Sequence, residues 1–358
     1  MNECMANNVT RVGGHTYNGI TGQVANSIGN RGKCRALLEN LIRSSASVLD
    51  DYGGGHRHST LKTSSPSAST VSNKVNPSQK LSRASVALIL RVCPSLKMNI
   101  VIGDSMHSRN MFFEQIDRLS TSDIHLLFIK RCARTGDPWS GHLGLPGGKN
   151  EDLESDLDAA IRETYEEVGI DLNQSDGYAC IGRLNDRRVR LHSKTLNMSY
   201  SAFVFWQQLE KSPEMKLSPG EVDAAFWVPL DLLTDNAAQF WNVRGVTKRQ
   251  ILFPQIQACI PRWLQTYCEM DLISFPAVDI APYAKEVHFL NDEVRREYPL
   301  QKFPPLWGLT LSATSDLVSI EALYPRLDQP MIVPHSAFMR VLFSVYSFFV
   351  SFQKRLVD

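Results

Sequence analysis

Three glutamates, Glu163, Glu166 and Glu167, stand in the segment of this chain that offers the most chemistry. Residues three and four apart are neighbours on a helix, so the three carboxylates are expected to share one patch. Like charges at these spacings destabilise an exposed helix, so stability does not explain the cluster. A divalent cation reverses the sign of the interaction, and carboxylate oxygens suit Mg²⁺ or Mn²⁺. The alternative is a solvated acidic face, which many surface helices carry.

The residues around the glutamates predict the helix that positions them. Ser155 is a candidate N-cap, with Asp158 as an acidic residue in the first turn, and Gly169 is a plausible end. Apolar and small residues recur at three- and four-residue steps and define one buried face: Leu157, Ala160, Ile161, Thr164 and Val168. The glutamates are therefore expected to project away from the core.

Three further residues favour a site over a solvated face. Arg162 can reach Glu166 across one helical turn and hold the carboxylate array in place. Gly147 and Gly148 precede the helix and allow a tight turn that a residue with a β-carbon makes less readily. Such a turn can also present backbone carbonyls to a metal.

Gly148, Glu154 and the run from Arg162 to Ile170 resemble the Nudix box at its defining positions, with Thr164 where an aliphatic residue is commoner. The resemblance implies an α/β/α sandwich around a mixed β-sheet, with the box as a loop-helix-loop. It also implies the hydrolysis of a nucleoside diphosphate linked to another moiety.

The resemblance assigns roles to the residues of the box. Glu163 and Glu167 would be the main Mg²⁺ or Mn²⁺ ligands, and Glu166 a further ligand or a group that orients water. Arg162 and Glu154 would support them. Metals at such a site neutralise charge on phosphoryl oxygens and lower the pKa of a bound water.

A base outside the box is often used in the family, and Glu221 resembles its later acidic residue. Glu221 lies in the predicted loop of LSPGEVDAAFWVPL, where a carboxylate is equally often only solvated. We therefore expect either a catalytic base or a surface charge at this position.

The stretch before the box resembles the upstream signature of the coenzyme A diphosphatases of the family. Gly141 and the run Leu145–Lys149 fit its second half, although Leu145 replaces the usual Phe, and Arg131 fits its first half. Arg134 is the nearest counterpart of the subgroup's internal arginine. The residues expected to bind substrate are Arg131, Arg134, Gly147, Gly148 and Lys149, of which the three cations suit phosphates but can equally be surface charges.

Three functions remain open on these residues. The first is a metal-dependent diphosphatase acting on coenzyme A or its acyl esters. The second keeps the chemistry but acts on ADP-ribose, a dinucleotide or a nucleotide sugar. The third is a non-catalytic nucleotide-binding module, against which the complete set of carboxylates argues.

The order of apolar segments predicts a mixed α/β domain over residues 84–320. Strands are expected at 86–92 and 124–130 before the box and at 177–184, 199–206 and 225–229 after it, with a closing helix within 306–318. Residues 1–83 are rich in Ser, Asn and Gly and are expected to be disordered, apart from a short helix allowed between Cys34 and Leu49. An irregular insertion is expected at about 270–305. The tail, 321–358, is expected to hold a short apolar helix.

Composition limits the partners of this chain. Of its 358 residues 43% are hydrophobic, and a formal net charge of +1 leaves no global field for nucleic acid, so none is expected as a partner. Seven cysteines without a CxxC pair fit a reducing compartment. The tail at 337–355 is expected to dock on the domain, with contact to a membrane surface as the alternative. Nudix domains frequently form homodimers, and the sequence leaves this point open.

The sequence leaves the compartment unknown within the cell, with cytoplasm or mitochondrion as the candidates. Arg31, Lys33, Arg35 and Arg43, with few acidic neighbours, are compatible with an organellar presequence. The chain ends in Leu356-Val357-Asp358, which is not a peroxisomal tripeptide.

Overall fold

A computed structural model describes most of the chain between residues 82 and 320, together with a few shorter segments. The described residues are 32–44, 82–103, 105–136, 140–190, 197–234, 246–249, 261–267, 272–320, 323 and 333–334. The apolar tail helix expected at 337–355 therefore lies outside the described residues. Within them, no helix is long and apolar enough to cross a membrane.

The main sheet is organised around its central strand β1 (Ser82–Val92). In the described part of the chain this sheet has nine strands, and its longest path runs β12-β8-β2-β1-β7-β5. β1 runs parallel to β7 (Asn197–Gln207), and the other pairings of the sheet are antiparallel. The mixed sheet expected from the sequence is confirmed.

Seven further strands complete this sheet on either side of β1 and β7. They are β2 (Ile124–Arg131), β3 (Leu143–Gly144), β4 (Gly147–Lys149), β5 (Tyr178–Arg183), β6 (Arg187–Arg190), β8 (Val222–Pro229) and β12 (Lys285–Phe289). β3 pairs with β2, β4 with β1, and β6 with β7. The strands that the sequence predicts at 124–130, 177–184, 199–206 and 225–229 correspond to β2, β5, β7 and β8.

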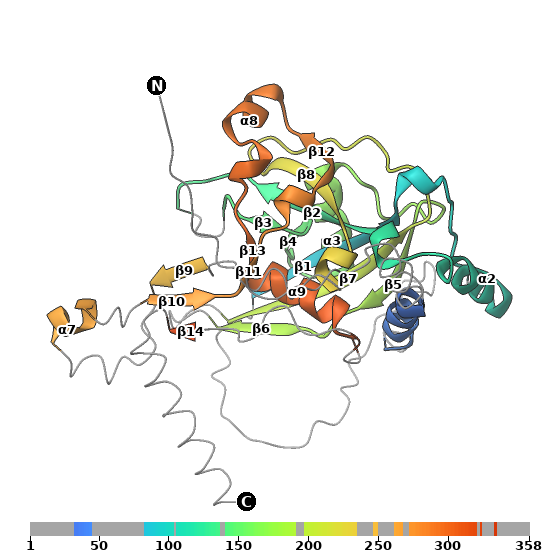
Figure 1. The fold of residues 1–358 in the computed structure, drawn as a ribbon, viewed down its shortest axis with the longest axis horizontal. Helices are drawn as coiled ribbons and strands as arrows, with labels where there is room; N and C mark the ends of the chain where they lie inside the picture. The colour runs from blue at the N-terminus through green and yellow to red at the C-terminus, as the bar shows by residue number, and fades with distance from the viewer. Residues whose placement is uncertain are drawn as a thin grey trace, which may run out of the picture.

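Helices cover both faces of the sheet, which produces the sandwich (Figure 1). α3 (Asp156–Val168) packs on one face, where β1 contributes Ala87 and Ile89. α2 (Met106–Ile116) and α9 (Gly308–Val318) pack on the other, where β1 contributes Leu88 and Leu90. Because both faces are covered, the middle of β1, Val86–Leu90, is continuously apolar rather than alternating.

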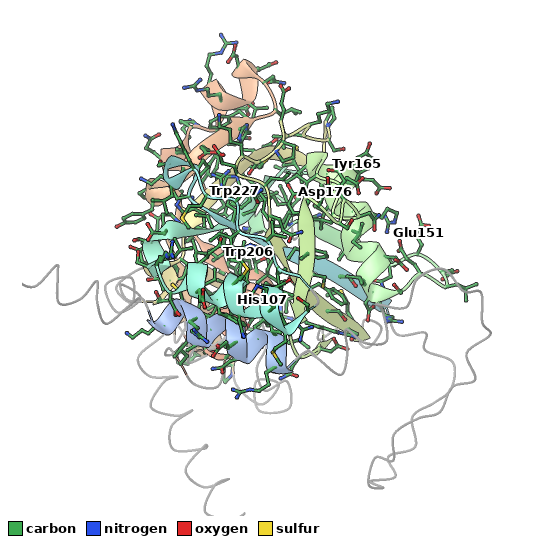
Figure 2. All side chains as sticks on the ribbon, turned by 90° about the vertical axis from the view of Figure 1, so that its right-hand side faces the viewer. His107, Glu151, Tyr165, Asp176, Trp206 and Trp227 are labelled. Carbon is green, nitrogen blue, oxygen red and sulfur yellow. The ribbon has the colours of Figure 1, made fainter. Side chains whose placement is uncertain are left out.

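A helix of residues 32–44 lies beside α2 in both views (Figures 1 and 2). Its Leu37, Leu38 and Leu41 are buried in the same core as α2. Arg35 donates to Asp117 at 2.7 Å, directly after α2. The short helix that the sequence allows in the N-terminal region is therefore present and belongs to the domain.

The region 272–305 differs from the irregular insertion expected there. β12 completes the main sheet by pairing with β8, and α8 (Asp292–Glu297) follows it. β11 (Ala277–Val278) pairs with β13 (Leu306–Trp307), while β10 (Leu272–Phe275) joins β9 (Val246–Arg249) and β14 (Val333–Pro334) in a small sheet. These elements are too short, and too interrupted by proline, to show a period in the sequence.

Short helical elements complete the described fold. They are α4 (Asp231–Thr234) and α7 (Arg262–Tyr267), with single 3₁₀ turns at Pro94–Leu96, Thr121–Asp123, Ala281–Tyr283 and Leu300–Lys302. α4 follows β8 with only Leu230 between them.

Local signals set both ends of α3 as the sequence predicts. The Ser155 hydroxyl accepts from the Asp158 N–H at 3.1 Å. Gly169 has a φ of 73°, and its N–H donates to the Tyr165 carbonyl at 2.9 Å. The left-handed conformation that ends the helix is readily adopted by glycine.

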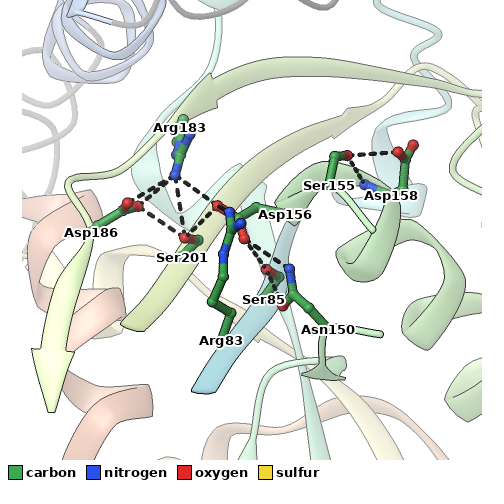
Figure 3. A network of polar contacts seen from close by, with 9 residues as sticks. All are labelled: Arg83, Ser85, Asn150, Ser155, Asp156, Asp158, Arg183, Asp186 and Ser201. Carbon is green, nitrogen blue, oxygen red and sulfur yellow. Dashed lines mark hydrogen bonds and ion pairs between the residues drawn. The ribbon is translucent and has the colours of Figure 1, made fainter. Parts of the chain in front are cut away.

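A buried carboxylate, Asp156, ties the first turn of α3 to the sheet (Figure 3). Arg83 of β1 pairs with it at 2.5 Å and Arg183 of β5 at 3.1 Å. Ser201 of β7 and Asn150 also donate to it, at 3.2 and 2.8 Å. Burial favours the neutral acid, but Arg83 and the other donors hold the pKa of Asp156 below its ordinary value.

Asp156→Asn is expected to lower the free energy of unfolding by roughly 2–3 kcal/mol at neutral pH, because it removes the charge that several donors share. A lowered pKa adds stability above the unfolded-state value of about 4 and loses it as the pH falls through the folded-state pKa. The difference in the free energy of unfolding between Asp156→Asn and the wild type should therefore become smaller in acid. Urea unfolding at pH 7 and pH 3 measures this.

The matched control is Asp158→Asn, an exposed carboxylate in the same turn (Figure 3). We expect it to change stability by less than about 1 kcal/mol at either pH. Equal losses in the two variants would contradict the anchoring role of Asp156.

Candidate active site

A cavity of about 420 Å³ opens between α3, the segment from β3 to β4, the start of β7 and the first turn of α9. Most of the residues that the sequence predicts as functional line this cavity: Arg131, Arg134, Gly147, Gly148, Lys149, Glu163, Glu167 and Glu221. Residues from four separate parts of the chain thus meet in one cavity.

Glu167 is the most deeply placed acid of the cavity. It is only 6% exposed, and its Oε2 accepts from the Gly147 N–H at 2.9 Å. Burial raises the pKa of Glu167 to about 8, the hydrogen bond from Gly147 and the charge of Arg131 oppose the rise, and the charges of Glu163 and Glu221 add to it. This carboxylate is therefore short of positive charge.

Glu163 lies one turn earlier on the same side of α3. Burial is also the main reason that its pKa is raised, and Glu166 and Glu221 contribute. The Arg162 Nη1 donates to the Glu163 carboxylate at 3.0 Å and opposes this rise. Two partly desolvated carboxylates thus stand close together in the cavity wall.

Arg162 forms hydrogen bonds to three acids of the box, Glu154, Glu163 and Glu166. It donates to Glu154 from Nε at 2.8 Å and from Nη2 at 3.0 Å. It also bonds Glu166 at 2.9 Å, as the sequence predicts, and the Lys149 carbonyl at 3.2 Å. The hydrogen bond from Arg162 lowers the pKa of Glu154, so this carboxylate stays ionised and anchors the guanidinium.

The single patch of three glutamates expected on α3 is divided in the structure. Glu166 has a side chain that is 52% exposed and does not line the cavity. At about 100° per residue, Glu163 and Glu167 differ by only about 40° around the helix, whereas Glu166 lies about 100° from Glu167. The pair that faces the cavity is therefore Glu163 and Glu167.

The described residues hold no group of three or more His, Cys, Asp or Glu side chains placed to bind a metal ion as they stand. Arg162 draws Glu163 and Glu166 towards itself, and Gly147 holds Glu167. A metal at this site would have to replace some of these contacts.

Both glycines of β4 are required by close approach. A β-carbon on Gly147 would lie 2.3 Å from the Ser85 carbonyl oxygen, and its φ of 142° strains any other residue. A β-carbon on Gly148 would lie 2.4 Å from Oε2 of Glu163. The first glycine lets β4 pair with β1, and the second makes room for a carboxylate.

Glu221 lies directly before β8 and reaches the cavity. Its carboxylate accepts from the Ser218 hydroxyl at 3.1 Å and pairs with the Arg134 Nη2 at 3.3 Å. Arg134 also donates from Nε to the Gly220 carbonyl at 2.6 Å. The two sequence-predicted residues therefore meet, from the segments just after β2 and just before β8, two strands that pair in the sheet.

The sequence did not reveal the apolar wall of the cavity. Trp307 and the first turn of α9 contribute to it, with Met198 and Tyr200 at the start of β7 and His142 beside β3. The Trp307 Nε1 donates to Nδ1 of His142 at 3.2 Å, and the two rings meet edge to face. The segment 306–318 is expected as a core helix, and nothing in its pattern indicates that its first residues face a cavity.

Gly147→Ala is expected to lower the free energy of unfolding by at least about 2 kcal/mol, because its new β-carbon meets backbone that cannot move alone. Gly148→Ala should destabilise less, because the far end of the Glu163 side chain can shift away. Urea unfolding of both variants measures the difference. Gly32→Ala, which has open space around it, serves as the control, and a smaller loss for Gly147→Ala than for Gly148→Ala would contradict the close-approach argument.

Residues 119–249 match the family model described as the NUDIX domain. An uncharacterised protein of Schizosaccharomyces pombe is 36% identical over 163 residues, which cover 45% of each chain. A peroxisomal coenzyme A diphosphatase of Caenorhabditis elegans is 37% identical over 95 residues, which cover 25% of this chain and 36% of that protein. The chain thus spans less than half the length of either relative.

Solved structures also resemble this chain over less than half of its length. A bifunctional NMN adenylyltransferase/ADP ribose pyrophosphatase from Francisella tularensis, complexed with AMP and a manganese ion, is 19% identical. The match covers 43% of this chain and 36% of that one, with a TM-score of 0.27.

Proposed function

We propose that this chain, whose residues 119–249 match the NUDIX domain model, hydrolyses the pyrophosphate bond of coenzyme A, an acyl-CoA or a related nucleoside diphosphate derivative in a metal-dependent reaction. One observation carries the proposal. Three carboxylates, Glu163, Glu167 and Glu221, line the same cavity as Arg131, beside the two glycines of β4. Acids for a metal and a cation for phosphate are thus within reach of one bound molecule.

The acids of the cavity fit a divalent cation. Glu163 and Glu167 are both desolvated, and the charge of Glu163 raises the pKa of Glu167 further, so positive charge beside them relieves both burial and repulsion. Oxygen ligands of this kind suit Mg²⁺ or Mn²⁺. When bound, such an ion supplies charge neutralisation on phosphoryl oxygens and activation of water. Glu163 and Glu167 would hold it, with Glu166 as a further ligand after a change of side-chain conformation.

The remaining residues act on the substrate itself. Arg131, Arg134 and Lys149 line the cavity and would bind the phosphates, and Gly147 and Gly148 let a phosphate approach the backbone. Glu221 would accept the proton of the attacking water at its carboxylate, which Ser218 and Arg134 orient. Arg162 and Glu154 would keep Glu163 in place.

Coenzyme A is the substrate class that we favour. The segment before the box resembles the upstream signature of coenzyme A diphosphatases, and a relative with that name is 37% identical over a quarter of this chain. A 3′-phosphate and two bridging phosphates also suit three cations at one cavity. ADP-ribose, a dinucleotide or a nucleotide sugar is the alternative. The complete set of box carboxylates argues against a module that only binds nucleotides.

The metal mechanism predicts that Glu167→Gln lowers the rate of hydrolysis by about 100-fold or more, since a lost ligand removes several kcal/mol of charge stabilisation. Steady-state kinetics with Mg²⁺ or Mn²⁺ measure it. Asp176→Asn changes an exposed carboxylate outside the cavity and should keep the wild-type rate. Unchanged hydrolysis in Glu167→Gln would show that the metal mechanism is wrong.

The substrate is tested by incubating the purified protein with Mg²⁺ or Mn²⁺ and each candidate, with mass spectrometry of the products. From coenzyme A we expect an adenosine phosphate and a phosphopantetheine. Turnover of ADP-ribose without any cleavage of coenzyme A or its esters would overturn the substrate assignment. Absence of hydrolysis with every pyrophosphate would overturn the enzymatic function.

A further inference from the structure

The strands β2 and β8 change register where they reach the cavity. Lys130 pairs with Ala224 but Arg131 pairs with Val222, so Asp223 is an extra residue on β8. Val222 packs on the α3 face of the sheet and Ala224 on the opposite face. Residues two apart share a face in a regular strand, so a β-bulge at Asp223 accounts for the reversal.

The carboxylate of Asp223 is fastened at this bulge from two sides. It forms a buried ion pair with the Lys130 ammonium, whose side chain is 3% exposed, and the ammonium also lies 4.2 Å from the centre of the Tyr298 ring. Its Oδ1 accepts from the Cys132 thiol at 2.8 Å. Burial, together with this hydrogen bond, raises the pKa of Cys132 to about 12, so the thiol keeps its proton.

Stability alone does not account for a lysine and an aspartate at this position. The desolvation of a buried ion pair offsets most of its attraction, and an apolar pair of similar size often serves the fold as well. Bulges beside active sites commonly re-aim a side chain. The ion pair is therefore expected to act on the residues next to it in the sequence.

Those neighbours line the cavity. Arg131 follows Lys130, and Glu221 stands two residues before Asp223. The backbone between them is joined, because the Cys132 N–H donates to the Glu221 carbonyl at 2.9 Å. A change in the bulge would thus be transmitted to both side chains.

We propose that Asp223 is a positioning residue: by holding Lys130 and Cys132 at the bulge, it fixes Arg131 and Glu221 in the cavity that Glu163 and Glu167 also line. The proposal rests on the proposed function, in which Glu221 accepts a proton and Arg131 binds phosphate. Asp223 itself does not line the cavity and touches no substrate in this scheme.

A double-mutant cycle on hydrolysis tests the proposal. Asp223→Asn alone is expected to lower kcat by roughly 10- to 100-fold, as supporting residues of a site typically do. In a Glu221→Gln background the same change should lower kcat by a several-fold smaller factor, because one of the two groups that Asp223 positions is already lost and only Arg131 is left to be displaced. Losses that multiply in the double variant would overturn the positioning of Glu221.

The joint variant Lys130→Met with Asp223→Leu separates positioning from stability. It removes both charges and keeps the volume apolar, so we expect thermal unfolding within a few degrees of the wild type but a kcat as low as that of Asp223→Asn. Wild-type kcat in this variant would overturn the proposal.

A crystal structure of Asp223→Asn tests the inference even if the wild type hydrolyses no pyrophosphate. Displacement of the Glu221 and Arg131 side chains is expected, with Glu163 and Glu167 unmoved. Glu221 and Arg131 in their wild-type positions would overturn it. Displacement together with an inactive wild type would leave the positioning role standing and refute the proposed function.

Discussion

The approach of β4 to both β1 and α3 without an intervening β-carbon is the constraint on which the cavity depends. Gly147 donates its backbone N–H to the buried carboxylate of Glu167, and Gly148 leaves the space that the Glu163 side chain fills. One neutral donor is little compensation for a desolvated charge. Glu167 therefore lies in an environment that favours either its protonation or the binding of a cation. The other residues of the box surround this uncompensated carboxylate.

Local rules predict the part of the site that lies within one helix. The Ser155 cap, the Gly169 end and the Arg162–Glu166 pair are found where the sequence places them, because each depends on residues no more than four apart. Helical spacing also brings Glu163 and Glu167 together. It does not reveal that Glu166 turns outward, since which side of α3 meets β4 is decided by packing against the sheet.

Long-range contacts set what the sequence does not show. The donors that surround Asp156 come from β1, β5, β7 and the segment before α3, and no local pattern relates them. The apolar wall at Trp307 comes from residues more than 130 positions after the box. The bulge at Asp223 is equally hidden, because one unpaired residue is visible only once the two strands are aligned. In each of these features, buried polar groups determine where helices and strands meet, and the burial of apolar side chains holds the elements together.

The central place of β1 has a consequence for how this protein is divided into units. The stretch matched by the family model begins at residue 119, after β1 has ended at Val92. Yet β1 joins β2 to β7 and carries the partner of β4, so without it the sheet would part into two pieces with bare inner edges. The cooperative unit is thus wider than the recognisable signature, and a fragment cut at the signature's limits would be an aggregation-prone remnant rather than a smaller folded domain.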